Sequence, residues 1–171
     1  MQPDELLQLT RHMDWADASV WAAVVATSEA HSDKRMKDLL HHLHVVQWVY
    51  LQIWRGDQLD MPDASSFADL GAIRDWRREY YPQLMKFWDG VDSEQLQRQV
   101  DFPWADGLVK RWGAAQPVTL SESVVQACFH STYHRGQLNM RLRELGGEPP
   151  LVDFVAWIWM GRPEPEWEQE T

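Results

Sequence analysis

Cysteine is nearly absent from this sequence, because Cys128 is the only one in 171 residues. A single thiol excludes an internal disulfide and a zinc site built from cysteines. No apolar run approaches the roughly 18–20 residues that cross a membrane. The first residues, MQPDELLQLTRHMDWAD, carry early acids and no apolar core, unlike a secretory signal. These absences predict a cytoplasmic protein with no membrane partner.

Basic residues are also scarce. The chain has 16 Lys and Arg against 26 Asp and Glu, which gives a formal net charge of −10. Nucleic-acid phosphates require clustered Lys and Arg, so the charge excludes a nucleic-acid partner. Part of the acidic excess lies in an acidic tail at about residues 162–171, which we expect to be solvated.

What is present fits one folded domain spanning residues 1–171. Hydrophobic residues make up 44% and charged residues 25%, the composition of a globular protein. This length permits a sizeable core, and neither a repeat nor a long linker interrupts it. Most of the eleven tryptophans are expected to anchor that core.

Apolar periodicity, together with proline and glycine positions, predicts five helices. They cover about residues 3–27, 33–55, 66–88, 119–145 and 154–159. Gly56 should end the second helix and Asp153 should cap the last one. Pro82 should kink or break the third. Thr119 and Glu122 form the T-x-x-E capping box that begins the fourth.

Residues 97–118 have a different character. Asp106-Gly107 lies between apolar stretches, which is typical of a tight β-hairpin turn, and Pro103 would confine its strand to a sheet edge. The predicted fold class is therefore all-α. We expect an up-and-down four-helix bundle with a short β-hairpin insertion and a short C-terminal helix.

Two histidines mark the fourth predicted helix. His130 and His134 are four residues apart, so their rings stack on one face. On a helical wheel they share a polar stripe with Gln137 and Arg141, between two apolar flanks. One flank is Val124, Leu138, Leu142 and Leu145, the other is Phe129, Tyr133 and Met140, and the back holds Thr132, Arg135, Asn139 and Arg143. This pattern predicts a stripe that points inward, where paired imidazoles can bind a metal ion.

The second predicted helix carries the string HHLH at residues 41–44. His42 shares an apolar face with Leu39, Val46, Val49 and Ile53, so we expect it to face the bundle interior. His41 and His44 point away by roughly 100° and 160° and are predicted to be rim or surface groups. His12 and His31 are also expected at the surface.

Antiparallel packing of these two helices would bring His42 to His130 and His134. Three neutral imidazoles leave coordination positions open, and three ligands plus water is the catalytic pattern rather than the closed structural one. A closed site would need a fourth ligand from Asp14, Asp17 or Glu122, which are otherwise surface acids. Cys128 projects away from the stripe and is predicted to be neither ligand nor nucleophile.

The histidine strings also resemble a known family. HSTYHRGQLNMRLRELGGEPPLVDF, residues 130–154, is similar to the signature region of the DinB family of DinB/YfiT-like helical-bundle metalloenzymes. LLHHLHVVQWVYLQIWRG, residues 39–56, and HMDWADASVW, residues 12–21, resemble its second-helix and first-helix patterns. The H-x-x-x-H-R-G-Q string is fairly specific, and the likeness touches most of the chain.

The resemblance implies a four-helix bundle with one long connection and a metal site open to water. It implies that His42, His130 and His134 hold nickel, zinc, iron or manganese, and that the protein is a homodimer. Gln137 is then expected to hydrogen-bond a ligand imidazole. Relatives with known activity use a low-molecular-weight thiol such as bacillithiol, mycothiol or glutathione, and others are described as metal-dependent hydrolases.

Three functions stay open on the sequence alone. The first is an enzyme for a small-molecule substrate, in which the metal lowers the pKa of water or a thiol to make a nucleophile. Arg141 would then contact a substrate anion, or else form a salt bridge at a helix end. The second is a non-catalytic metal-binding or sensor module. The third is a dimerising scaffold with no metal.

Overall fold

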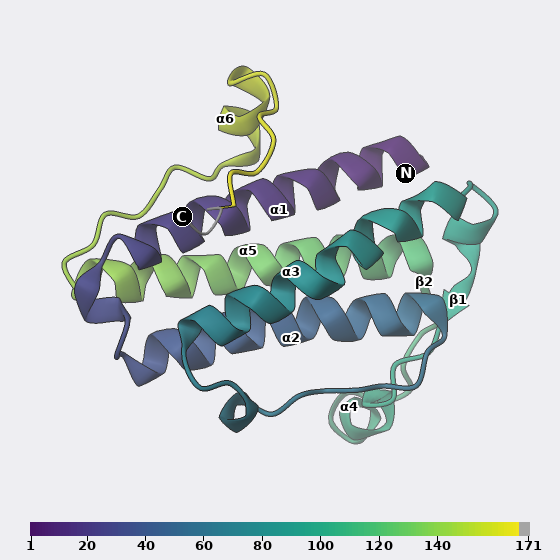
Figure 1. Cartoon of the computed structure of the whole chain (residues 1–171). Helices are drawn as coiled ribbons and strands as arrows, with labels where there is room; N and C mark the ends of the chain where they lie inside the picture. Colours follow the sequence, from purple (N-terminus) through teal and green to yellow (C-terminus); the bar gives the residue numbers. More distant parts are fainter. Residues whose placement is uncertain (168–171) are drawn as a thin grey trace.

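The computed structural model describes residues 1–167 and is mainly helical (Figure 1). The long helices are α1 (Pro3–Val25), α2 (Lys34–Arg55), α3 (Leu70–Phe87) and α5 (Leu120–Glu144), and the short ones are α4 (Ala105–Trp112) and α6 (Phe154–Trp159). Short 3-10 turns are η1 (Ser28–Ala30), η2 (Ala64–Ser66), η3 (Trp88–Gly90) and η4 (Gln95–Gln97). Strands β1 (Gln99–Val100) and β2 (Val118–Thr119) pair antiparallel. The predicted all-α bundle with a small strand pair and a C-terminal helix is confirmed.

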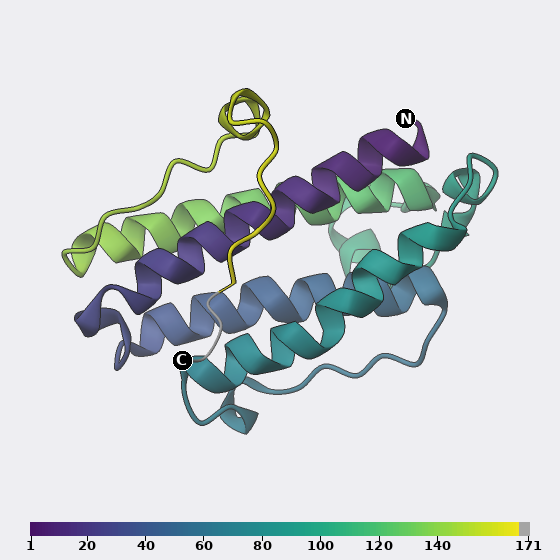
Figure 2. The same cartoon turned by 45° about the horizontal axis from the view of Figure 1, so that its top comes forward.

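The four long helices form the bundle, with α5 packed against both α1 and α2 (Figures 1 and 2). After α2 the chain returns along that helix, so that Lys37 donates to the carbonyl of Phe67. Helix α3 therefore begins beside the start of α2 and runs parallel to it, ending where Arg55 contacts Gln83. The four long helices therefore do not alternate strictly in direction, because residues 56–69 make one long connection between α2 and α3.

Local sequence signals set several helix ends, and those at Gly56 and Thr119 were predicted. The Asp33 side chain accepts from the backbone N–H of Met36 (2.7 Å) at the start of α2, and Gly56 ends that helix with φ +72°. The Thr119–Glu122 capping box begins α5. Pro82, by contrast, does not break α3, which continues to Phe87. Buried packing on one face holds that helix together and outweighs the missing hydrogen bond.

The predicted hairpin turn at Asp106-Gly107 is wrong. These residues lie inside α4, with Asp106 in its first turn and Lys110 and Arg111 in its last, which suits the helix dipole. The strands lie farther apart in the sequence, and their register is Gln99↔Thr119 and Val100↔Val118. Pro103 lies outside both strands. Val100 is buried in the core, and the residues between the strands form a helix.

The core has two large apolar clusters and a small third one of Trp15, Ala16 and Trp157. The first large cluster contains Leu6, Leu51, Leu84 and Leu120, and the second contains Trp21, Leu40, Ile73 and Leu138. Buried polar side chains separate these two; we call these side chains the polar layer, and its members are Asp17, His44, Gln47, Tyr80, Ser131 and Arg135. Among residues 1–167, no helix is long and apolar enough to span a bilayer.

The acidic tail is not solvated along its whole length. The Trp167 ring lies over the Arg77 guanidinium (3.7 Å to the ring centroid), and its Nε1–H donates to Asp14 Oδ1 (3.0 Å). Trp167 is half-buried against the second apolar cluster. The expectation of a free end is therefore wrong at Trp167, and residues 168–171 lie outside the described chain.

Candidate metal centre

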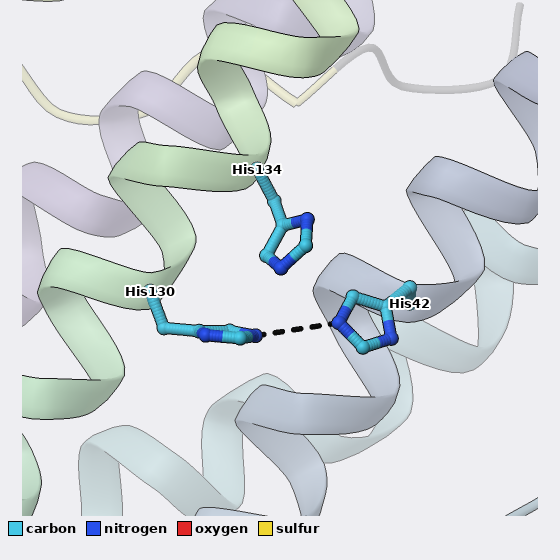
Figure 3. Close-up of side chains that lie close together, drawn as sticks. All are labelled: His42, His130 and His134. Carbon is cyan, nitrogen blue, oxygen red and sulfur yellow. Dashed lines mark hydrogen bonds between the residues drawn. The ribbon is translucent and has the colours of Figure 1, made fainter.

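Helices α2 and α5 bring three histidines to one point. His42 comes from α2, and His130 and His134 come from successive turns of α5 (Figure 3). One ring nitrogen from each lies within 4.8 Å of the other two. The Nε2 atoms of His42 and His130 are 3.3 Å apart. The structure therefore brings together the three residues that the sequence singled out.

This spacing suits a single metal ion. Imidazole nitrogens bind Zn²⁺ at about 2.0–2.1 Å, so two ligands on one tetrahedral ion are about 3.3 Å apart. The His42–His130 pair already has that separation, and the His134 ring lies 4.3 Å from each of the other two rings, centroid to centroid. Three nitrogen donors from two helices can thus hold a divalent transition metal with small side-chain rotations.

The cluster lies at the edge of the bundle rather than inside it, which corrects the predicted orientation. His42 is exposed, and His130 and His134 are half-buried. The buried stripe of α5 instead runs through Ala127, Ser131, Arg135, Leu138 and Leu142. Its centre is about 80° around the helix from the histidines at 100° per residue. Arg135, predicted at the back of the helix, is therefore buried, and the flank of Phe129, Tyr133 and Met140 faces solvent.

The protonation states favour a cation as partner. Burial, followed by the neighbouring His134 and His42, lowers the pKa of His130 to about 4. Burial and His134 also lower the pKa of His42. Both rings are therefore neutral near pH 7 and carry a nitrogen lone pair. His134 Nδ1–H donates to Gln137 Oε1 (2.9 Å), which directs the Nε2 lone pair of His134 away from Gln137.

His44 is the clearest error of the sequence-based prediction. It is fully buried, not at the rim. Its Nε2 accepts from Trp21 Nε1–H (2.8 Å) and its Nδ1–H donates to Tyr80 Oη (3.0 Å), so both ring nitrogens are used. The signal was present in α2, because Leu40, His44, Gln47 and Leu51 recur at spacings of three and four. That stripe is the buried one.

The remaining histidines lie apart from the cluster. His12, predicted at the surface, is buried, and its Nε2–H donates to the carbonyl of Val152 (2.9 Å). His41 is half-buried and His31 is exposed.

Cys128 lines a cavity of about 490 Å³ beside His12, between α1, α5 and residues 150–154. Burial raises the pKa of its thiol to about 12, which disfavours the reactive thiolate.

No carboxylate joins the three histidines within the described part of the chain. Asp14 and Asp17, expected as surface acids, are buried in ion pairs with Arg77 and Arg135. Glu122 is exposed and engaged in the capping box of α5. The donor set is therefore three imidazoles, which leaves further coordination positions for small molecules.

Arg141 was predicted either to contact a substrate anion or to form a salt bridge at a helix end, and the structure shows the salt bridge. Its guanidinium donates to both carboxylate oxygens of Asp33 and to Glu144 Oε2. These two acids raise its pKa further above the ordinary arginine value. The Asp33 contact also ties the start of α2 to the end of α5.

A family model described as the DinB family matches residues 1–169, nearly the whole chain. No curated protein matches the sequence. The chain therefore belongs to the DinB family.

Proposed function

We propose that this DinB-family protein is a metal-dependent enzyme whose ion is held by His42, His130 and His134. The observation that carries the proposal is the convergence of three ring nitrogens within 4.8 Å, with no carboxylate among them in residues 1–167. Three imidazoles accept nickel, zinc, iron or manganese, and metal supply often decides among them.

A bound ion of this kind acts as a Lewis acid that lowers the pKa of a water or a thiol. The protein supplies the orientation. Gln137 holds the His134 ring through Nδ1, and the exposed position of His42 gives a small molecule access to the cluster. We therefore propose a hydrolase that uses water, or a transferase that uses a low-molecular-weight thiol.

We also propose that the protein acts in the cytoplasm as a homodimer. A single buried free cysteine suits a reducing compartment. Large apolar side chains are exposed on α5 and near α6, which is typical of a surface that contacts another chain. They are Phe129, Tyr133, Met140, Leu151, Phe154, Val155, Trp159 and Met160.

One observation favours a second candidate, a non-catalytic metal-binding or sensor module. His42 is exposed and the neighbouring Tyr133 ring is 65% exposed. A side chain from a partner can therefore reach the open coordination positions. A bound ion with four protein ligands would identify this function and exclude the open site that catalysis requires.

The test is elemental analysis of the full chain purified without chelators or nickel resin. We expect about one transition-metal ion per chain, and His134→Ala should lose it. His31→Ala is the matched control, because His31 is exposed and lies in the loop between η1 and α2, outside the cluster. Stoichiometric metal in His134→Ala would contradict the assignment.

Titration with a small thiol then separates the two reactions. Saturable thiol binding that requires the metal supports transfer. Its absence in the metal-loaded protein supports water as the nucleophile.

A further inference from the structure

We infer that Asp17 is a positioning residue, which sets the spacing of the two helices that carry the metal ligands. It lies on α1, which contributes no histidine to the cluster, and is 1% exposed. The inference rests on the proposed function, because it concerns the geometry of that metal site.

One carboxylate oxygen of Asp17 holds α5. Arg135 Nη1 donates to Asp17 Oδ1 (2.8 Å), and both side chains are almost completely buried, at 3% and 2% exposure. Arg135 directly follows His134 in the chain. Its Nη2 also donates to Thr132 Oγ1 (2.9 Å), so the guanidinium is fixed from two sides. The backbone position of His134 is thereby tied to α1.

The other carboxylate oxygen holds α2. Gln47 Nε2 donates to Asp17 Oδ2 (2.7 Å) and to Ser131 Oγ (3.1 Å). Tyr80 Oη donates to Gln47 Oε1 (3.0 Å), which fixes the orientation of the amide and turns its NH₂ toward Asp17. Gln47 lies on the helix of His42, and Ser131 directly follows His130. One carboxylate therefore links the two ligand-bearing helices to each other.

The two contacts together require two acceptor oxygens, which a carboxylate provides. An asparagine at position 17 has the same shape but only one acceptor oxygen, and its NH₂ would face a donor of either Arg135 or Gln47. The variant would also leave the Arg135 cation buried without its counter-charge. Asp17→Asn thus disturbs the link without creating a cavity.

A matched control lies one turn earlier on α1. Asp14 is also buried, with 6% exposure, and it pairs with the buried Arg77 of α3. Its other partner is Trp167. None of these residues lies on α2 or α5, so Asp14→Asn removes an ion pair of the same kind without touching the link between the ligand-bearing helices.

The experiment compares wild type, Asp17→Asn and Asp14→Asn as full chains, with Co²⁺ as the probe ion. Co²⁺ affinity and its visible absorption bands report the site, and urea unfolding of the metal-free proteins reports the fold. We expect Asp17→Asn to weaken Co²⁺ binding about 10- to 100-fold and to alter the bands, the effect typical of groups that orient metal ligands. Asp14→Asn should keep the wild-type Co²⁺ affinity and absorption bands, even if its urea unfolding midpoint falls as much as that of Asp17→Asn.

Wild-type affinity and bands in Asp17→Asn would overturn the inference. Equal losses in the two variants would also overturn it, because general loosening of the fold would then explain the effect. Failure of the wild type to bind Co²⁺ would instead contradict the proposed metal site.

If Asp17→Asn does not fold, Gln47→Leu carries the test. It keeps the ion pair with Arg135 and removes the contact of Asp17 to α2, together with the contacts of Gln47 to Ser131 and Tyr80. A loss of Co²⁺ affinity of about 10-fold would support the inference, and unchanged affinity would overturn it.

Discussion

The outer cluster of His42, His130 and His134 differs from the polar layer beneath it in its unused hydrogen-bonding capacity. In the polar layer no buried side-chain atom lacks a partner among the described residues. In the outer cluster the Nε2 atoms of His42 and His130 face each other at 3.3 Å, and both rings are neutral near pH 7. Converging ring nitrogens with few hydrogen-bond partners, rather than burial, therefore identify the candidate metal ligands.

The polar layer shows the opposite case. Its hydrogen bonds run in one direction, from Trp21 to His44, then to Tyr80, Gln47 and Asp17. Each group donates to the next, so His44 carries its proton on Nδ1 and is neutral. Burial lowers the pKa of His44 to about 4, which agrees with that state. A histidine with both nitrogens satisfied stabilises the bundle and needs no metal.

The largest expected effect separates these two regions. His44→Ala should lower the free energy of unfolding by about 3 kcal/mol, because it leaves the donor of Trp21 unpaired and opens a cavity. Urea unfolding of the metal-free protein measures this change. Bound metal should remain stoichiometric at saturating concentration.

His42→Ala provides the converse. Its exposed side chain should change stability by less than about 0.5 kcal/mol, while metal binding is lost. The distinction between the two regions would be contradicted if both variants lost the metal, or if both unfolded at a lower urea concentration than wild type.

A smaller effect is expected at the tail, where the Trp167 ring covers the buried guanidinium of Arg77. Trp167→Ala removes the cation–π contact to Arg77 and the hydrogen bond to Asp14, and should lower the free energy of unfolding by about 1–2 kcal/mol. Met61→Ala is the control, because that residue is 61% exposed and lies outside the surface proposed for the homodimer. Metal affinity should not change in either variant, and equal stability of the two would show that the tail contributes nothing.

The smallest effect concerns pH and His12. Burial, opposed by the Val152 carbonyl, lowers the pKa of His12 in the folded chain. The unfolded chain therefore takes up the proton more readily. The contribution of neutral His12 to the free energy of unfolding is complete above about pH 6.5, and it decreases as the pH falls below that value.

The measurement is urea unfolding at about pH 7.5 and about pH 5. His12→Gln should lose less stability than wild type between these values, because it lacks the titrating ring. An equal loss in both proteins would mean that His12 titrates alike in the folded and unfolded chains.

Local signals predicted most helix ends and the three histidines that the structure brings together. Asp33, Gly56, Thr119 and Glu122 act through neighbouring backbone groups, so the sequence is enough to interpret them. The Asp106-Gly107 turn failed for the opposite reason. Those two residues favour a turn, but the pairing of β1 and β2 leaves room for a helix between the strands.

The sequence by itself determined the helical class, the family and the three histidines, because helix periodicity, caps and the H-x-x-x-H spacing are local properties of the chain. Only the tertiary structure decided which polar groups are buried. On a single wheel His42 and His44 both lie near apolar residues, and Asp17 looks like a surface acid. Their surroundings depend on which neighbouring helix packs against each face, and residues such as Trp21 and Arg135 supply those partners from distant parts of the chain.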